Sequence, residues 1–161
     1  MKLRTATDAD ADTIWAMLEP VFRAGATYAV DRDISRDAAL AHWTGGNHRV
    51  FVAEDESGAA VGTYYLCRNC GGGGSHVANA GFVTAHGAEG KGVARAMVAH
   101  ALSQARAHGF RAMQFNFVAA TNRRAIDLWL KYDFAIVGRL PKAFAHPTEG
   151  YVDAFVMFRS L

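Results

Sequence analysis

Apolar residues recur in the first half of the chain with the spacings that regular secondary structure requires. An apolar stripe through Ile14, Leu18 and Phe22 predicts an amphipathic helix, which Pro20 should bend or divide. Ser35 is placed to cap a second, shorter helix. Alternating runs predict extended strands. The expected elements are helices over residues 8–24 and 35–43, and strands over residues 2–7, 48–54 and 59–66.

The second half of the chain alternates between strand-like and helix-like patterns. It predicts strands over residues 76–84, 110–118, 134–139 and 151–158, and helices over residues 92–108 and 122–132. The two strands around the first of these helices should be parallel, because a right-handed crossover connects them. No internal repeat or linker interrupts the chain. We therefore predict a single domain over residues 1–161, of the α/β or α+β class, with a mixed sheet.

Composition and charge narrow the class of protein. The 161 residues are 51% apolar and 20% charged, which fits a globular domain, and the net charge of +2 is scattered. Such a weak charge gives no reason to expect nucleic acid as a partner. Charged residues near the amino terminus exclude the apolar core of a signal peptide, and no apolar run reaches bilayer-spanning length. We expect a cytoplasmic protein that binds neither nucleic acid nor membrane.

The two cysteines, Cys67 and Cys70, form a single C-x-x-C pair. A structural zinc site needs a second pair of ligands, and a redox pair gains thiolate character by opening a helix. This pair instead runs into four glycines, Gly71–Gly74. We therefore expect two reduced thiols and no metal site.

The residues Glu89 to Ala94 form a glycine turn that follows a predicted strand and opens a predicted helix. Two alternate glycines allow close approach of a ligand, and the helix amino terminus adds unpaired N–H groups, so the turn is a candidate phosphate socket. A nucleotide P-loop is disfavoured because Gly90-Lys91 is followed by glycine rather than a hydroxyl. A dinucleotide fingerprint is disfavoured because the turn lies mid-chain. A turn that merely uses glycine is an equally good interpretation of this segment alone.

The glycine turn and a later segment together resemble the GCN5-related N-acetyltransferase (GNAT) family. The residues that carry the resemblance are Gly90-x-Gly92-x-Ala94, Asn122-x-x-Ala125-Ile126-x-Leu128-Trp129 and Phe134. The resemblance implies an acyl-CoA N-acyltransferase fold of six to seven strands with about four helices, and acetyl-CoA as co-substrate. It implies cofactor contacts at Phe82, Val83 and Thr84 along the pantetheine arm, at Gly90, Lys91, Gly92, Val93, Ala94 and Arg95 around the pyrophosphate, and at Asn122 and Trp129 near the thioester.

Two residues depart from that family pattern. Glu89 stands where the family usually has arginine or glutamine, so we expect its carboxylate to face solvent. Trp129 aligns with a tyrosine that many members use to protonate the CoA thiolate, and an indole N–H cannot serve as that acid. Tyr132, one turn further on, is a candidate replacement.

Further segments resemble the fungal acetyltransferases that detoxify L-azetidine-2-carboxylate, a proline analogue. These segments are residues 22–28, 76–81, 114–116, 138–141 and 150–154. In that group the asparagines matching Asn79 and Asn116 are implicated in substrate binding and catalysis. Both lie inside apolar strand patterns, where an unpaired buried amide costs about 1–3 kcal/mol. They are therefore candidate catalytic residues, with structural amides bonded to backbone as the alternative.

These observations predict acetyl transfer from acetyl-CoA to the amine of a small molecule, such as an amino acid or proline analogue, by direct attack in a ternary complex. Backbone N–H groups of the strand at Phe82 are candidates for polarising the thioester carbonyl. His76 is a candidate base, and Tyr28, Tyr65 and Tyr151 are candidate pocket aromatics. The alternatives are a different amine or a protein amino terminus as acceptor, or a catalytically weak CoA-binding module. A homodimer through the late strands is a further hypothesis.

Overall fold

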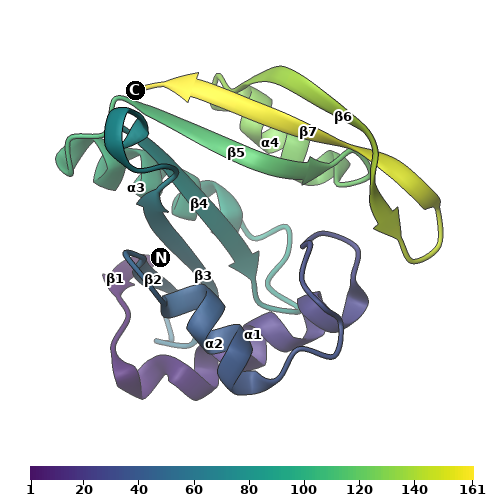
Figure 1. The fold of residues 1–161 in the computed structure, drawn as a ribbon. Helices are drawn as coiled ribbons and strands as arrows, with labels where there is room; N and C mark the ends of the chain where they lie inside the picture. The colour runs from purple at the N-terminus through teal and green to yellow at the C-terminus, as the bar shows by residue number, and fades with distance from the viewer.

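The computed structural model describes all of residues 1–161 and contains one seven-stranded mixed sheet in the order β1-β2-β3-β4-β5-β7-β6 (Figure 1). Four α-helices accompany it, so the predicted fold class is confirmed. The strands are β1 (Lys2–Thr5), β2 (Arg49–Glu54), β3 (Ala60–Arg68), β4 (Val77–Thr84), β5 (Ala112–Ala119), β6 (Ala135–His146) and β7 (Gly150–Ser160). The helices are α1 (Ala11–Ala24), α2 (Arg36–Thr44), α3 (Val93–Ala107) and α4 (Arg123–Lys131).

The sheet carries a hydrophobic core on each face. Successive side chains of a strand point to opposite faces, so alternate residues of β3 separate into two sets. Tyr64 and Leu66 pack in the core that contains the buried residues of α3 and α4. Tyr65 and Cys67 pack in the other core, with the buried residues of α1 and α2. The helices therefore form two layers, α1 and α2 on one face and α3 and α4 on the other.

The parallel pair predicted around α3 is present, but it is very short. β4 and β5 are paired only at Val77–Ala112 and Ala78–Met113. The antiparallel pairing of β3 with β4 continues to Thr84. The two halves of the sheet therefore diverge beyond Ala78, and Figure 1 shows β4 and β5 separating toward their carboxyl ends.

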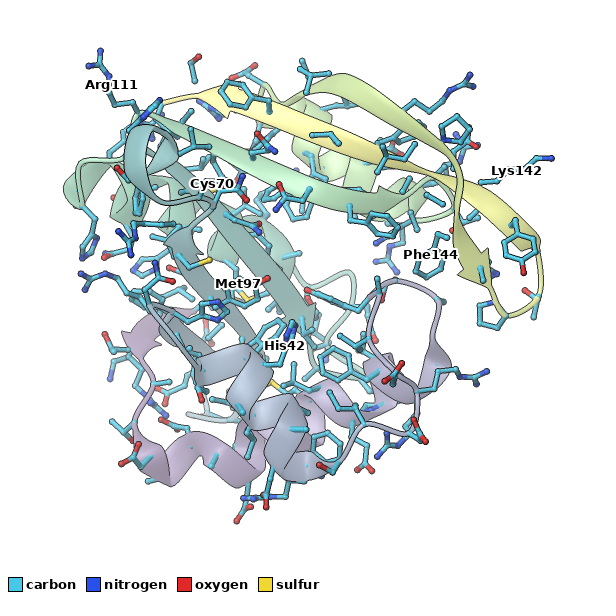
Figure 2. All side chains as sticks on the ribbon, in the orientation of Figure 1. His42, Cys70, Met97, Arg111, Lys142 and Phe144 are labelled. Carbon is cyan, nitrogen blue, oxygen red and sulfur yellow. The ribbon has the colours of Figure 1, made fainter.

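Two elements contain a proline, and the second of them differs from the sequence prediction. Helix α1 runs without a break through Pro20, after a 3₁₀ turn at Asp8–Asp10. Strand β6 continues past Pro141, where the prediction ended it, because an edge strand has one side on which a missing N–H costs no ladder bond. The pairing of β6 with β7 shifts register between Leu140 and Phe144, and Lys142 adopts a left-handed φ of 51°. Figure 2 shows Lys142 projecting outward while Phe144 lies on the inner side of the hairpin.

The outer strand β6 exposes Ile136, Val137 and Leu140. A homodimer through these late strands stays a prediction. None of the helices combines the length and the hydrophobicity that crossing a membrane requires.

An ion-pair cluster connects the start of α1 to the first two strands. The Arg4 guanidinium donates to both oxygens of Asp10, at 2.8 and 2.7 Å, and to Glu54 Oε1 at 2.5 Å. The backbone N–H of Thr7 also donates to Asp10, at 2.7 Å. The hydrogen bonds from Arg4, followed by those from Thr7, hold the pKa of the Asp10 carboxyl well below its usual range.

Asp10→Asn is expected to lower the free energy of unfolding at pH 7 by about 1–3 kcal/mol, because hydrogen bonds to charged groups are lost. Asp10 stabilises the fold above the unfolded-state pKa of about 3.9, and this contribution is lost as the pH falls toward the lower folded-state pKa. Denaturant unfolding at pH 7 and pH 3 should therefore show a smaller difference between wild type and variant in acid. Asp12→Asn is the matched control, because the Asp12 side chain is 89% exposed. A difference that stays constant with pH would contradict this role.

Candidate functional site

A cleft of about 930 Å³ opens where β4 and β5 separate. Its walls come from β4, β5, the glycine turn, the first turn of α3, helix α4 and the segment between α1 and α2. Lys91 is exposed and is not part of the lining. The other predicted site residues all line the cleft: Asn79, Phe82, Val83, Thr84, Gly90, Gly92, Val93, Ala94, Arg95, Asn116, Asn122 and Trp129.

The glycine turn has the backbone conformation that only glycine adopts without strain. Gly90 and Gly92 have φ values of 78° and 81°, and Gly92 is the amino-terminal cap of α3. No atom lies within 4 Å of the position that a Cβ would take at either residue. The turn therefore presents its backbone to open space at the positive end of the α3 dipole, which is the arrangement that binds anions.

Glu89 folds back onto the glycine turn. Its Oε2 accepts a hydrogen bond from the Gly87 N–H at 2.8 Å, and its Oε1 lies 3.7 Å from His86 Nδ1. The side chain is 44% exposed, although the residue lines the edge of the cleft. Hydrogen bonds from its own backbone N–H and from that of Gly87 lower the pKa of the Glu89 carboxyl. The carboxylate is thus held by the turn itself.

The backbone of β4 divides its hydrogen bonds between the two sides of the strand. Asn69 N–H donates to Val77 O at 2.8 Å, and Ala85 N–H donates to Val61 O at 2.9 Å. These bonds place the odd-numbered residues of β4 against β3, since antiparallel pairing alternates along the strand. The backbone groups of Phe82 and Thr84 therefore face the gap toward β5, whereas those of Val83 face β3.

Asn79 and Asn116 lie on the same face of the sheet, the one that α1 and α2 cover. Asn79 is the register partner of Cys67, which belongs to that core. Asn116 follows Phe115, whose side chain packs in the opposite core. The Asn116 amide donates to Asn69 Oδ1 at 2.6 Å, and its oxygen accepts from Gln114 Nε2 at 2.8 Å. The structure thus brings both predicted asparagines to one cleft, and it adds a polar chain through Asn116.

Asn122 and Trp129 have structural contacts in addition to their position in the cleft. Asn122 Oδ1 caps α4 by accepting from the Ala125 N–H at 3.4 Å. The Trp129 ring is buried and packs against Phe82 and Phe115, with ring centroids 5.2 and 4.7 Å away. Trp129 therefore forms an apolar wall beside the gap in the sheet.

Three other candidates lie outside the cleft. The Tyr132 hydroxyl donates to the Arg95 carbonyl at 3.1 Å, so it is directed at α3 rather than into the cleft. Tyr151 is 75% exposed in the β6–β7 hairpin. His76 is exposed just before β4. None of these three residues is part of the cleft lining, so the structure gives them no place in the site.

Aromatic residues define the α1–α2 side of the cleft. The Tyr65 ring lies over Gly81, where an added Cβ would come within 2.4 Å of it. The same ring stacks on His48 and meets Trp43 edge-on, with centroids 4.3 and 4.9 Å away. Gly81 therefore provides the room that lets Tyr65 reach the cleft wall.

His42 is a cleft residue that no sequence pattern indicated. His42 lines the cleft from α2, and burial, followed by the charge of His48, lowers the pKa of its imidazole (Figure 2). Every Asp, Glu, Lys or Arg in the lining belongs instead to the glycine turn, α3 or α4: Glu89, Arg95, Arg124, Asp127 and Lys131. The two sides of the cleft thus differ in chemistry, one charged and the other aromatic and amide-rich.

Both cysteines are free thiols, as predicted. Burial raises the pKa of Cys67 to about 11, whereas Cys70 is exposed. His, Cys, Asp and Glu side chains nowhere form a group of three that could hold a metal ion.

The fold thus combines a short parallel pair that opens into a cleft with a glycine turn at the edge of that cleft. Residues 12–134 match the model of the acetyltransferase (GNAT) family. The chain therefore belongs to the GNAT family, as the resemblance predicted.

Individual relatives agree with this assignment. The fission yeast (Schizosaccharomyces pombe) N-acetyltransferase aca1 is 35% identical over 97 residues, which are 60% of this chain and 46% of that protein. The chain thus matches less than half the length of this curated relative. A GCN5-related N-acetyltransferase from Kribbella flavida is 40% identical, with a TM-score of 0.94 over 99% of this chain and 97% of that one. A GNAT superfamily phosphinothricin acetyltransferase from Sinorhizobium meliloti, in complex with acetyl-CoA, shares the fold at 24% identity and a TM-score of 0.85, over 99% and 88% of the two chains.

Proposed function

We propose that this protein transfers the acetyl group of acetyl-CoA to the amine of a small molecule, by direct attack within a ternary complex. The observation that carries the proposal is the single cleft between β4 and β5. One end holds the glycine turn and the charged residues of α3 and α4, and the other holds the aromatic and amide side chains. A cofactor and an acceptor bound at the two ends would meet beside Phe82.

The residues of the first end fit acetyl-CoA. Gly90 and Gly92 present open backbone at a helix amino terminus, which suits a pyrophosphate. Arg95, Arg124 and Lys131 line the same end and add positive charge. Beyond Phe82, the gap-facing backbone of Thr84 suits an amide of the arm that precedes the thioester. When bound there, acetyl-CoA supplies an activated thioester. The solved phosphinothricin acetyltransferase of similar fold also contains acetyl-CoA.

The protein's own part in the reaction is to orient the acceptor and to stabilise the charge that develops on the carbonyl oxygen. An alkyl amine with a pKa near 10 is only about one thousandth neutral at pH 7, so an orienting or proton-accepting contact accelerates attack. Asn79 and Asn116, which both line the cleft, would hold the amine, or a water that takes its proton. His42 lies on the same side of the cleft. The Phe82 N–H is directed at the gap, where it can polarise the carbonyl.

The acceptor end favours a compact amine over a polycation. The cleft lining on this side contains no carboxylate that would attract a polyamine or an aminoglycoside. Tyr28, Tyr65 and Val30 offer apolar surface, and the two asparagines offer neutral hydrogen-bonding groups. This chemistry suits a small amino acid or a proline analogue such as azetidine-2-carboxylate, whose ring is apolar and whose amine and carboxylate balance in charge.

The proposal is tested by CoA release from acetyl-CoA with a panel of acceptors, together with calorimetry of acetyl-CoA alone. The panel contains azetidine-2-carboxylate, proline, phosphinothricin, spermidine and a short peptide with a free amino terminus. We expect acetyl-CoA to bind and turnover to be fastest with a compact amino acid. Binding without turnover on the whole panel would favour a CoA-binding module, and turnover confined to the peptide would favour a protein amino terminus.

A further inference from the structure

The Tyr28 hydroxyl makes a contact that the predicted role of an ordinary pocket aromatic does not explain. It accepts a hydrogen bond from the Phe82 N–H and donates one to the Phe82 carbonyl, both at 2.9 Å. These are the two backbone groups that Phe82 directs at the gap between β4 and β5. One side chain therefore satisfies the donor and the acceptor that a neighbouring strand would otherwise have bonded.

The Tyr28 ring is held from the α1–α2 side of the cleft. Tyr28 belongs to the segment between α1 and α2, which also lines the cleft at Thr27 and Val30. Its ring meets Phe22 and Trp43 edge-on, with centroids 5.5 and 5.9 Å away. The contact thus connects segments 54 residues apart in the chain, and both of its residues line the cleft.

A thioester carbonyl can replace Tyr28 at one of these two bonds but not at the other. A carbonyl oxygen accepts hydrogen bonds and donates none, so it can bind the Phe82 N–H and not the Phe82 carbonyl. Burial raises the pKa of the Tyr28 hydroxyl. The hydroxyl therefore stays protonated at neutral pH and keeps its ability both to donate and to accept.

We propose that, in the free protein, the Tyr28 hydroxyl is hydrogen-bonded to the same Phe82 N–H that the thioester carbonyl of acetyl-CoA binds. Tyr28 thereby weakens the preference of the protein for acetyl-CoA over CoA. This inference rests on the proposed function. Acetyl-CoA has to exchange its thioester carbonyl for the hydroxyl at Phe82, whereas CoA lacks the thioester carbonyl and leaves the contact intact. In wild type the carbonyl therefore replaces an existing hydrogen bond instead of satisfying an unpaired N–H, and its contribution to affinity is reduced.

The test is a cycle of two proteins and two ligands, with dissociation constants measured by calorimetry. The proteins are wild type and Tyr28→Phe, and the ligands are acetyl-CoA and S-ethyl-CoA, a thioether in which CH₂ replaces the carbonyl. Tyr28→Phe leaves the Phe82 N–H unpaired, so acetyl-CoA should bind about two- to tenfold more tightly, while the affinity for S-ethyl-CoA stays the same. Tyr132→Phe removes a hydroxyl outside the cleft and should change neither affinity.

An equal change for both ligands in Tyr28→Phe would show a general structural role and would overturn the inference. Failure of wild type to bind either ligand would overturn the proposed function and this inference with it. If the variant does not fold, nuclear magnetic resonance of the wild-type protein provides the test. The label is placed at the Phe82 nitrogen and in the Tyr28 ring. The two signals should move together with acetyl-CoA and stay in place with CoA. Identical Tyr28 signals in the two complexes would overturn the inference.

Discussion

Asn79→Ala and Asn116→Ala are each expected to reduce turnover of the best acceptor by about 100- to 1000-fold. Loss of one well-placed hydrogen-bonding group at a reacting centre has effects of this size. Both amides lie on the α1–α2 face beside the gap in the sheet, where an acceptor amine would meet the thioester. The measurement is the rate of CoA release, accompanied by calorimetry showing that acetyl-CoA still binds.

The controls separate catalysis from packing. Asn47→Ala changes an exposed asparagine outside the cleft and should keep wild-type turnover. Asn69→Ala removes the partner of the Asn116 amide and should lower turnover less than Asn116→Ala, because the reacting contact remains. When Asn79→Ala and Asn116→Ala are combined in one variant, the two losses of turnover should be less than additive, since both amides hold the same acceptor. Wild-type turnover in both single variants would refute the role of the asparagines.

Gly92→Val is expected to weaken acetyl-CoA binding at least about tenfold, which corresponds to about 1.4 kcal/mol. The φ of 81° is left-handed, a conformation that costs a residue with a side chain about 1–2 kcal/mol. The new side chain also fills the open space in front of the backbone that would face the pyrophosphate. Calorimetry with acetyl-CoA measures the loss of affinity, and thermal unfolding measures the strain.

Gly58→Val is the matched control for this change. Gly58 lies in the turn between β2 and β3 with a φ of 84°, and no atom lies within 4 Å of its hypothetical Cβ either. It should therefore lose a similar amount of stability and keep wild-type affinity for acetyl-CoA. Equal affinities in the two variants would argue against the glycine turn as the pyrophosphate site.

Much of the fold was predictable because its determinants are local. Ser35 accepts from the Ala38 N–H at the start of α2, and Gly25 ends α1 in a left-handed conformation, as the sequence indicated. The glycine turn was recognisable for the same reason, since its glycines and the helix that follows are adjacent in sequence. The local signal failed at Pro141, where position at a sheet edge decided the outcome.

The order of the elements, the glycine turn and the asparagines in apolar strands could all be recognised from local pattern. Tertiary packing, by contrast, separates β4 and β5 after two residue pairs and so creates the cleft. It directed Tyr132 away from that cleft and brought Tyr28 to the Phe82 backbone. Such contacts depend on how distant segments pack across a sheet face. Periodicity within one segment carries information about its own conformation and burial, but none about the partner that it will meet.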